Sequence, residues 1–429
     1  MIANERMTQV MKMRAIRKAH SMTQLSLAVA MNCSSSTVDN YENGRNPVSD
    51  HMYKAFKKAT GMEGVPLTGD EIVAFKKEQL YAWNFMINYG DINQAKELQS
   101  NIGYCVMWSY DTELQVLYDI FCINYHSKID EMEDSDKIVA SLKKREHELT
   151  DEQRYWHCRY LGVLEHRSWR CKPAINMYMK AEEIGGRLGL NDTALYYNIS
   201  DCLTFMGYPY LSIVYLQKIQ LKEFNISNVS YGFATQRLLA VNYSKLGRIC
   251  EALELLEKYR EYLLCEMKDG KYRLGIVYHS IGWVYQNAED FEKTLENYDL
   301  ASQHYDKKSE LYIRYLCDKA SLLRTHNRND EAKSCVDKGL SMVAEGTLWY
   351  EWLNAIKHSL VLDKKGSVEY IQWAAIPKFH EYGKHTLAME CYEWLSDNCR
   401  KNGMYKSAGE YSEQAFGIYK QLMKGDLSL

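Results

Sequence analysis

The stretch Ser-Ser-Ser-Thr-Val-Asp-Asn-Tyr-Glu-Asn-Gly-Arg-Asn-Pro at residues 34–47 decides how the first part of this chain is interpreted. Its four small polar residues can cap and open a short helix. Val38 and Tyr41 then share one face, while Gly44 ends the helix and Pro47 keeps it from restarting. The opposite face is polar and consists of Ser35, Ser36, Asp39 and Asn40. A short helix with such a face is typical of proteins that read base edges in DNA.

Three more helices are predicted around this segment. They cover residues 7–19, residues 23–30 with Thr23 as N-cap, and residues 50–60. Asn32 lies where the turn needs a left-handed residue, a conformation that asparagine tolerates. The sequence therefore predicts a compact all-helical domain over residues 1–62.

This domain resembles the Cro/repressor-like helix-turn-helix family. The residues that carry the resemblance are Thr23, Gln24, Leu27, Ala28, Val38 and the run Tyr41-Glu42-Asn43-Gly44-Arg45. The departure is Asn32, which stands in place of the usual turn glycine. The resemblance implies that Gln24 contacts a backbone phosphate. The predicted DNA-binding residues are Gln24, Ser35, Ser36, Asp39, Asn40, Arg45, Arg14 and Arg17. The alternative is a small helical bundle that does not bind DNA.

Charge is distributed unevenly along the chain. Residues 1–65 hold nine Lys/Arg and five Asp/Glu, a net charge of +4, and the remainder carries −7. The sign suits a partner with phosphates. One small domain would bind DNA weakly and in a salt-sensitive way, so we expect a homodimer that reads two half-sites.

Composition points to an all-α protein beyond this domain. Among 429 residues there are only five prolines and 46% hydrophobic residues, with no low-complexity tract. The 12 cysteines form no C-x-x-C motif, so no metal or redox site is predicted. No stretch approaches the apolar length of a membrane span. We therefore expect a cytoplasmic protein.

A repeat follows a predicted linker at residues 63–69. A small residue recurs at one position in the second helix of each expected hairpin, with a weaker match near Ser135. These positions are Ala95, Ser135, Ala174, Ser212, Ala252, Thr294, Ala332, Ile371 and Ala408. From Ala174 onward the spacing is 37 to 42 residues. Gly162 and Gly282 would allow close helix contact, and Gly207, Gly247 and Gly403 would lie in turns. Residues 70–429 resemble tetratricopeptide repeats, which implies a right-handed α-solenoid of about nine hairpins.

The concave face of such a solenoid can hold an extended peptide. Side-chain amides both donate to and accept from a peptide backbone, and an arginine can hold a carboxylate. The predicted peptide-binding residues are Asn198, Asp201, Arg237, His279, Trp283, Gln286, Asn287, Arg314, Asp318 and Arg324. Arg159, His166 and Ser321 belong to the wider inward-facing set. The alternative for each is a solvated helix face. Trp349, Tyr350 and Trp352 are predicted to lie in the core.

No catalytic motif is present. The chain lacks a glycine-rich phosphate loop, His-Glu-x-x-His and Gly-x-Ser-x-Gly. His380 and His385 are five residues apart and are not expected to share a helical face. We therefore predict that the protein is not an enzyme and has no cofactor and no metal.

The combination of a repressor-like domain with these repeats resembles the RRNPP family of peptide-pheromone receptors, and its length is most similar to the neutral-protease-regulator branch. The resemblance implies a quorum-sensing transcription factor that binds double-stranded DNA and a short signalling peptide, with inner-face asparagines such as Asn198 and Asn287 on the peptide backbone. Two alternatives stay open. One is a DNA-binding adaptor whose repeats bind a partner protein, and the other is a repressor without a ligand.

Overall fold

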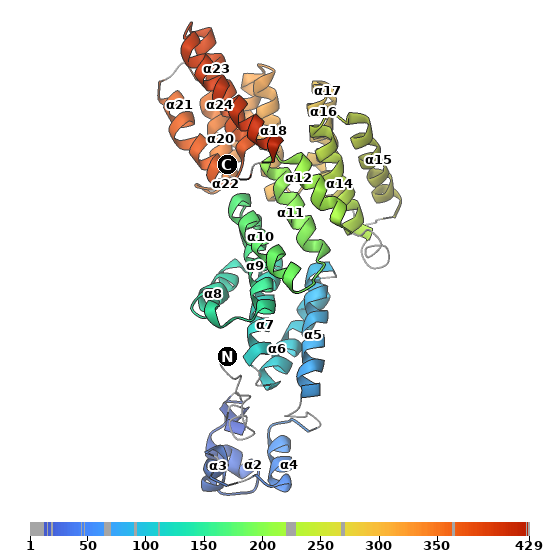
Figure 1. Ribbon diagram of the computed structural model, residues 1–429, viewed down its shortest axis with the longest axis vertical. Coiled ribbons are helices and arrows are strands. Elements are labelled where there is room, and N and C mark those ends of the chain that lie inside the picture. The colour runs from blue at the N-terminus through green and yellow to red at the C-terminus, as the bar shows by residue number, and fades with distance from the viewer. Residues whose placement is uncertain are drawn as a thin grey trace. The chain divides into compact units, whose positions relative to one another are not determined.

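The computed structural model describes residues 13–14, 16–18, 20–43, 45–46, 48–63, 70–89, 92–109, 112–219, 229–266, 271–362, 365–425 and 427. Every regular element in these residues is a helix (Figure 1). The chain separates into two compact units, residues 1–160 and residues 161–429, and each is described by itself.

The helix-turn-helix region lies in the first unit. It comprises α2 (Gln24–Ala30), α3 (Ser35–Glu42) and α4 (Asp50–Ala59). The hydroxyls of Thr23, Ser34 and Ser49 each cap one helix by accepting from a backbone amide. Asn32 has a φ of 53°, so the predicted left-handed turn is confirmed. The small core consists of Met13, Ile16, Leu27, Ala28, Met31, Val38, Phe56 and Met62.

Some predictions for this region lie outside the described residues. They are Gly44 and Pro47, most of the expected linker, and residues 7–12 of the expected first helix.

The rest of the first unit consists of longer helices. These are α5 (Asp70–Tyr89), α6 (Ile92–Ser109), α7 (Thr112–Lys128), α8 (Met132–Lys143), the 3-10 turn η1 (Glu146–Glu148) and most of α9 (Asp151–Arg167). Helix α5 packs on α6, and α7 packs on α8. Neighbours in sequence are therefore neighbours in space, as in a helical-hairpin array.

The second unit continues this pattern. It contains α10 (Cys171–Arg187), α11 (Thr193–Met206), α12 (Pro209–Lys218), α14 (Val229–Lys245), α15 (Ile249–Glu266), α16 (Lys271–Asn287), α17 (Phe291–Gln303), α18 (Glu310–Thr325), α19 (Asn329–Leu340), α20 (Leu348–Ser359), α21 (Lys365–Tyr370), the π-helical turn η2 (Ile371–Ala375), α22 (Ile376–Tyr382), α23 (His385–Lys401) and α24 (Tyr405–Lys424). The pairs α11–α12, α14–α15, α16–α17, α18–α19 and α23–α24 pack as hairpins.

The predicted repeat positions are buried throughout. All nine anchors, from Ala95 to Ala408, are at most 3% exposed. A Cβ at Gly282 would lie 2.5 Å from the ring of Tyr298, and one at Gly162 would collide with Tyr178, also 16 residues later. The glycine thus lets an aromatic ring of the next helix pack directly on the backbone. The predicted fold class, an all-α protein with a helix-turn-helix region and a helical-repeat solenoid, is confirmed.

None of the helices in the described part of the chain is both long and apolar enough to cross a membrane.

Candidate functional site

The first candidate surface is the outer face of α3. Ser35 and Ser36 are exposed, and Asn40 is half-buried. The hydroxyl of Ser34 accepts from the amide of Thr37 at 3.1 Å, which fixes the start of the helix. Arg14 and Arg45 are exposed and supply positive charge in the same domain. These side chains can meet bases and phosphates.

A buried ion pair holds α3 against the first helical segment. Arg17 Nε lies 2.5 Å from Glu42 Oε1 and its Nη2 donates to Oε2 at 2.8 Å. The two side chains are only 10% and 1% exposed. The hydrogen bond with Glu42 raises the pKa of Arg17 above its ordinary value. The prediction that Arg17 contacts DNA does not fit this geometry, because its guanidinium is used inside the domain.

Gln24 and Asp39 extend the same network. Gln24 Nε2 donates to Glu42 at 3.0 Å and to Asp39 at 3.2 Å. Asp39 also pairs with Arg45, with Nη1 3.3 Å from Oδ2. Gln24 is half-buried at the edge of the α3 face. The carboxylates of Asp39 and Glu42 fix the orientation of its side-chain amide.

The second candidate site lies in the second unit, around Asp318. His279 Nε2 lies 2.8 Å from Asp318 Oδ2, and Trp283 Nε1 donates to the same oxygen at 3.1 Å. Burial lowers the pKa of His279, so the neutral ring donates its Nε2 proton to the carboxylate. Burial is the largest influence and works against ionisation of Asp318, but the hydrogen bond from His279 and the nearby charges of Arg314 and Lys384 together outweigh it, so the pKa of Asp318 is lowered. Three predicted residues are therefore joined by hydrogen bonds.

Arg314 and Lys384 act electrostatically on this carboxylate, and Lys245 interacts with both of them. We call Lys245, Arg314 and Lys384 the cation cluster. The Arg314 guanidinium lies 4.3 Å from the ring centre of Trp283. Lys384 Nζ lies 3.3 Å from the ring centre of Phe205, and Lys245 Nζ donates to the carbonyl of Thr204 at 2.6 Å.

The charges of the cation cluster act on one another. Burial, and then the charge of Arg314, lower the pKa of Lys245 to about 8. The pKa of Lys384 is lowered by burial, then by Arg314 and Lys245. Desolvated cations that repel each other form a site to which an anion is attracted.

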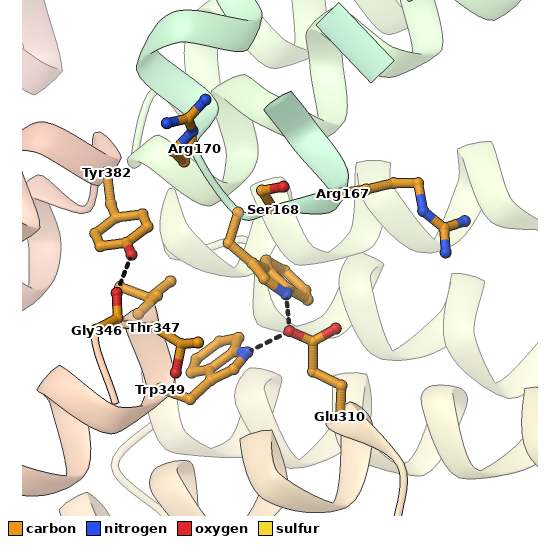
Figure 2. Close-up of a pocket in the computed structure, with 10 residues that line it drawn as sticks. Arg167, Ser168, Arg170, Glu310, Gly346, Thr347, Trp349 and Tyr382 are labelled. Carbon is orange, nitrogen blue, oxygen red and sulfur yellow. Dashed lines mark hydrogen bonds between the residues drawn. The ribbon is translucent and has the colours of Figure 1, made fainter. Parts of the chain in front are cut away.

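A pocket of about 350 Å³ opens nearby (Figure 2). Glu310 lies at its centre and accepts hydrogen bonds from the indoles of Trp349, at 3.0 Å, and Trp169. At the other edge Tyr382 donates to the carbonyl of Gly346 at 2.8 Å. Arg314 lies 5.4 Å from the ring centre of Trp169, which connects the pocket to the cation cluster. Trp349 is buried, as predicted, but its indole N–H faces this pocket.

The other predicted peptide-binding residues are placed differently. Asp201 lies 3.4 Å from His166 Nε2 and interacts electrostatically with Arg237. Asn198 is half-buried, and its side chain has no hydrogen-bond partner among the described residues. The remaining three bond within the protein.

Those three bonds connect neighbouring helices. Asn287 donates to Ser244 at 2.9 Å, and Gln286 accepts from Tyr298 at 2.5 Å. Arg324 donates to Ser359 at 3.0 Å and lies 4.4 Å from the ring centre of Trp394. These contacts stabilise the repeats, and each side chain would have to exchange a partner to meet a ligand.

Sequence reasoning missed Lys245, Lys384, Trp169 and Glu310. His380 and His385 do not share a helical face, as expected, but their Nδ1 atoms are 3.0 Å apart, a contact that was not predicted. Gly383, at a φ of 75°, ends α22 and turns the chain, so the two histidines face each other from two helices. Burial lowers both pKa values, that of His385 to about 3, and the pair is neutral.

Comparison with known proteins agrees with both halves of this description. Residues 13–63 match a family described as helix-turn-helix. No curated protein matches the chain.

Solved structures with a similar fold include a Rap protein complexed with competence and sporulation factor, at 15% identity and a TM-score of 0.69, covering 82% of this chain and 99% of that one. NprR in complex with its cognate peptide NprX is 18% identical, with a TM-score of 0.69 and coverage of 80% and 99%. The apo form of the quorum sensor NprR from B. thuringiensis is 19% identical, with a TM-score of 0.60 and coverage of 82% and 99%. The predicted resemblance to RRNPP regulators is confirmed at the level of architecture, because the chain has a helix-turn-helix segment and the repeat fold of the Rap and NprR structures.

Proposed function

We propose that this chain is a transcriptional regulator of the RRNPP type, which binds double-stranded DNA through α3 and a short signalling peptide in its second unit. The observation that carries the proposal is the cation cluster beside the half-buried indoles of Trp169 and Trp283 and the half-buried amide of Asn198. Arg314 provides a permanent positive charge, and Lys245 and Lys384 provide two amines whose charged form a bound anion would stabilise. The two nearby carboxylates, Asp318 and Glu310, already accept hydrogen bonds from His279 and tryptophan indoles.

A peptide suits this site better than a small anion does. Its terminal carboxylate, or an acidic side chain, would meet the cation cluster. Its backbone would meet Asn198, which has unused donor and acceptor groups. Apolar side chains would pack on Trp169 and Trp283. NprR, which shares the fold, was solved with its cognate peptide NprX, and a Rap protein was solved with competence and sporulation factor. Both complexes support this assignment.

On the DNA side we propose base contacts by Ser35, Ser36 and Asn40, with phosphate contacts by Gln24, Arg14 and Arg45. Asp39 would lie at the same surface, where its carboxylate positions Gln24 and Arg45. We assign residues 1–62 to the DNA-binding domain, 63–69 to a linker and 70–429 to the repeats. The active form would be a cytoplasmic homodimer on two half-sites, without a cofactor or catalytic activity.

Peptide binding would change the curvature of the solenoid and so the spacing of the two DNA-binding domains. A coupling free energy of about 1–3 kcal/mol is enough to switch occupancy of an operator.

Calorimetry with short peptides encoded next to the gene tests the ligand. We expect saturable binding that Arg314→Met weakens at least tenfold, since a charge-assisted hydrogen bond contributes about 1.5–3 kcal/mol. The matched control is Lys258→Met, because Lys258 is an exposed cation paired with Glu254 on the outer helix α15. Amidation of the peptide C-terminus should weaken binding to the wild type but not further weaken binding to Arg314→Met.

Loss of either Asn198 or Arg237 should reduce the peptide response and leave DNA binding without peptide intact. If the peptide response survives both substitutions and Arg314→Met, the assigned site is wrong.

Exposed aromatic side chains favour the second candidate, an adaptor that binds a partner protein. Trp373, Tyr405 and Phe416 are 72%, 76% and 63% exposed in the second unit. Large exposed apolar groups mark protein interfaces when they are contiguous. The adaptor would replace the receptor as the proposed function under two results. The chain would bind no peptide, and it would capture a partner protein in a way that Trp373→Ser abolishes.

A further inference from the structure

Three metal-ligating side chains meet where α9, α10 and α11 come together. They are His166 in the last turn of α9, Cys171 at the first position of α10 and Cys202 within α11. One ring nitrogen and the two sulfur atoms all lie within 4.8 Å of one another. Both cysteines are completely buried. We infer that these three residues form a site for a zinc ion.

The distances suit zinc with little movement. Zinc bonds of about 2.0–2.3 Å in a tetrahedron place neighbouring ligand atoms about 3.3–3.8 Å apart. Since the three atoms lie within 4.8 Å of one another, they need to approach by at most about 1.5 Å, which side-chain rotations supply. Two thiolates and an imidazole are ligands that zinc prefers over magnesium or calcium. Three protein ligands leave a fourth position for water or another donor.

The backbone fixes this geometry between His166 and Cys171. Trp169 has a φ of 59° and its amide donates to the carbonyl of His166 at 2.9 Å, while the amide of Arg170 donates to Glu165 at 2.9 Å. The Trp169 ring packs at 4.9 Å on Phe205. This turn therefore has one defined conformation, which fixes the spacing between His166 and Cys171.

The surroundings supply groups that a zinc site uses. Asp201 Oδ2 lies 3.4 Å from His166 Nε2 and can orient the ring, which leaves Nδ1 for the metal. Cys171 is the first residue of α10, and Lys384 interacts with it electrostatically. Burial, and then the neighbouring Cys171, raise the pKa of Cys202. Zinc binds cysteine as the thiolate, so binding would release thiol protons.

The zinc site does not depend on a peptide ligand, although Asp201 belongs to the predicted peptide-binding residues and also lies beside His166. Its test therefore uses zinc alone, with the full-length reduced protein in metal-free buffer. All variants would carry Cys250→Ser and Cys265→Ser, because these two cysteines are exposed and could bind metal weakly. Zinc is titrated against a chromophoric chelator, and cobalt is used to record thiolate ligation by absorption.

We expect one equivalent of zinc per chain and at least a hundredfold loss of affinity in Cys171→Ser and in Cys202→Ser. The matched control is Cys317→Ser, because Cys317 is equally buried but lies in α18 away from this site. It should bind zinc like the parent protein.

A second measurement needs no substitution in the core. Zinc should slow alkylation of Cys171 and Cys202, located by peptide mapping, and leave Cys317 unaffected. The inference is overturned if the parent protein binds no zinc, if both serine variants retain it, or if zinc protects neither cysteine.

Discussion

Replacing Gly282 by alanine should destabilise the second unit, although alanine favours helices. A Cβ at this position lies 2.5 and 2.6 Å from two ring carbons of Tyr298. Carbon atoms pack at about 3.5–4.0 Å, so the ring must move by about 1 Å. Tyr298 is fully buried and its hydroxyl donates to Gln286 at 2.5 Å, so the ring has no free space.

The magnitude follows from two opposing terms. Overpacking of this kind costs about 1–3 kcal/mol. Removing a glycine from a helix gains about 0.5–1 kcal/mol. With the middle of each range, the expected net loss is about 1 kcal/mol. Gly409→Ala is the matched control, because Gly409 lies in α24 with nothing within 4 Å of the added atom. That variant should gain about 0.5–1 kcal/mol.

The same substitution should reach the proposed ligand site. The His279 ring packs edge-on against Tyr298 with centroids 5.0 Å apart, and His279 holds Asp318. Moving Tyr298 would shift this carboxylate beside the cation cluster, so peptide affinity should fall in Gly282→Ala and stay constant in Gly409→Ala.

Urea unfolding and calorimetry of both variants measure the two effects. Gly282→Ala as stable as the wild type would refute the packing explanation. Lower stability with unchanged peptide affinity would refute the link from Tyr298 to Asp318.

Three further substitutions or conditions test the electrostatics. Glu42→Gln leaves Arg17 buried without its counter-charge and should cost about 3 kcal/mol in thermal unfolding of the N-terminal domain, whereas Glu254→Gln at an exposed pair should change little. Peptide affinity should fall as the pH rises through about 8, because Lys245 then loses the proton that attracts a carboxylate; calorimetry at pH 7 and 9 should show no such fall for Lys245→Met. Burial raises the pKa of Glu390 from 4.5 to about 7, so the folded state holds a proton that the unfolded state releases, and its contribution to stability is lost as the pH rises through about 7. Thermal unfolding of Glu390→Gln between pH 5 and 8 should lack this loss.

Features set by local chemistry were predictable from the sequence. Thr23 and Ser34 cap their helices because their hydroxyls reach an amide only three residues away. Asn32 adopts the left-handed turn that few other residues tolerate. The repeat was also predictable, because each hairpin must bury one small residue at the same place.

Features that depend on distant residues were not predictable. Glu310 joins Trp169 and Trp349, which are 141 and 39 residues away in sequence. No periodicity marks such a meeting point, since it depends on how successive hairpins are rotated. Arg17 illustrates a different limit. The position of Arg17 in the helical pattern fits either an exposed or a buried side chain, and only the contact with Glu42 decides between them.

The cation cluster also suggests how a local ligand could change the whole solenoid. Lys245 ends α14, Arg314 lies in α18, and Lys384 is the N-cap of α23, so three separate hairpins contribute one charge each. Arg314 disfavours the charged form of both lysines, and Lys245 does the same to Lys384. An anion bound between these groups would replace this repulsion by attraction and would favour closer approach of the three hairpins. An allosteric switch requires a coupling of only about 1–3 kcal/mol, so we expect neutralisation of the cation cluster to drive the proposed change in curvature.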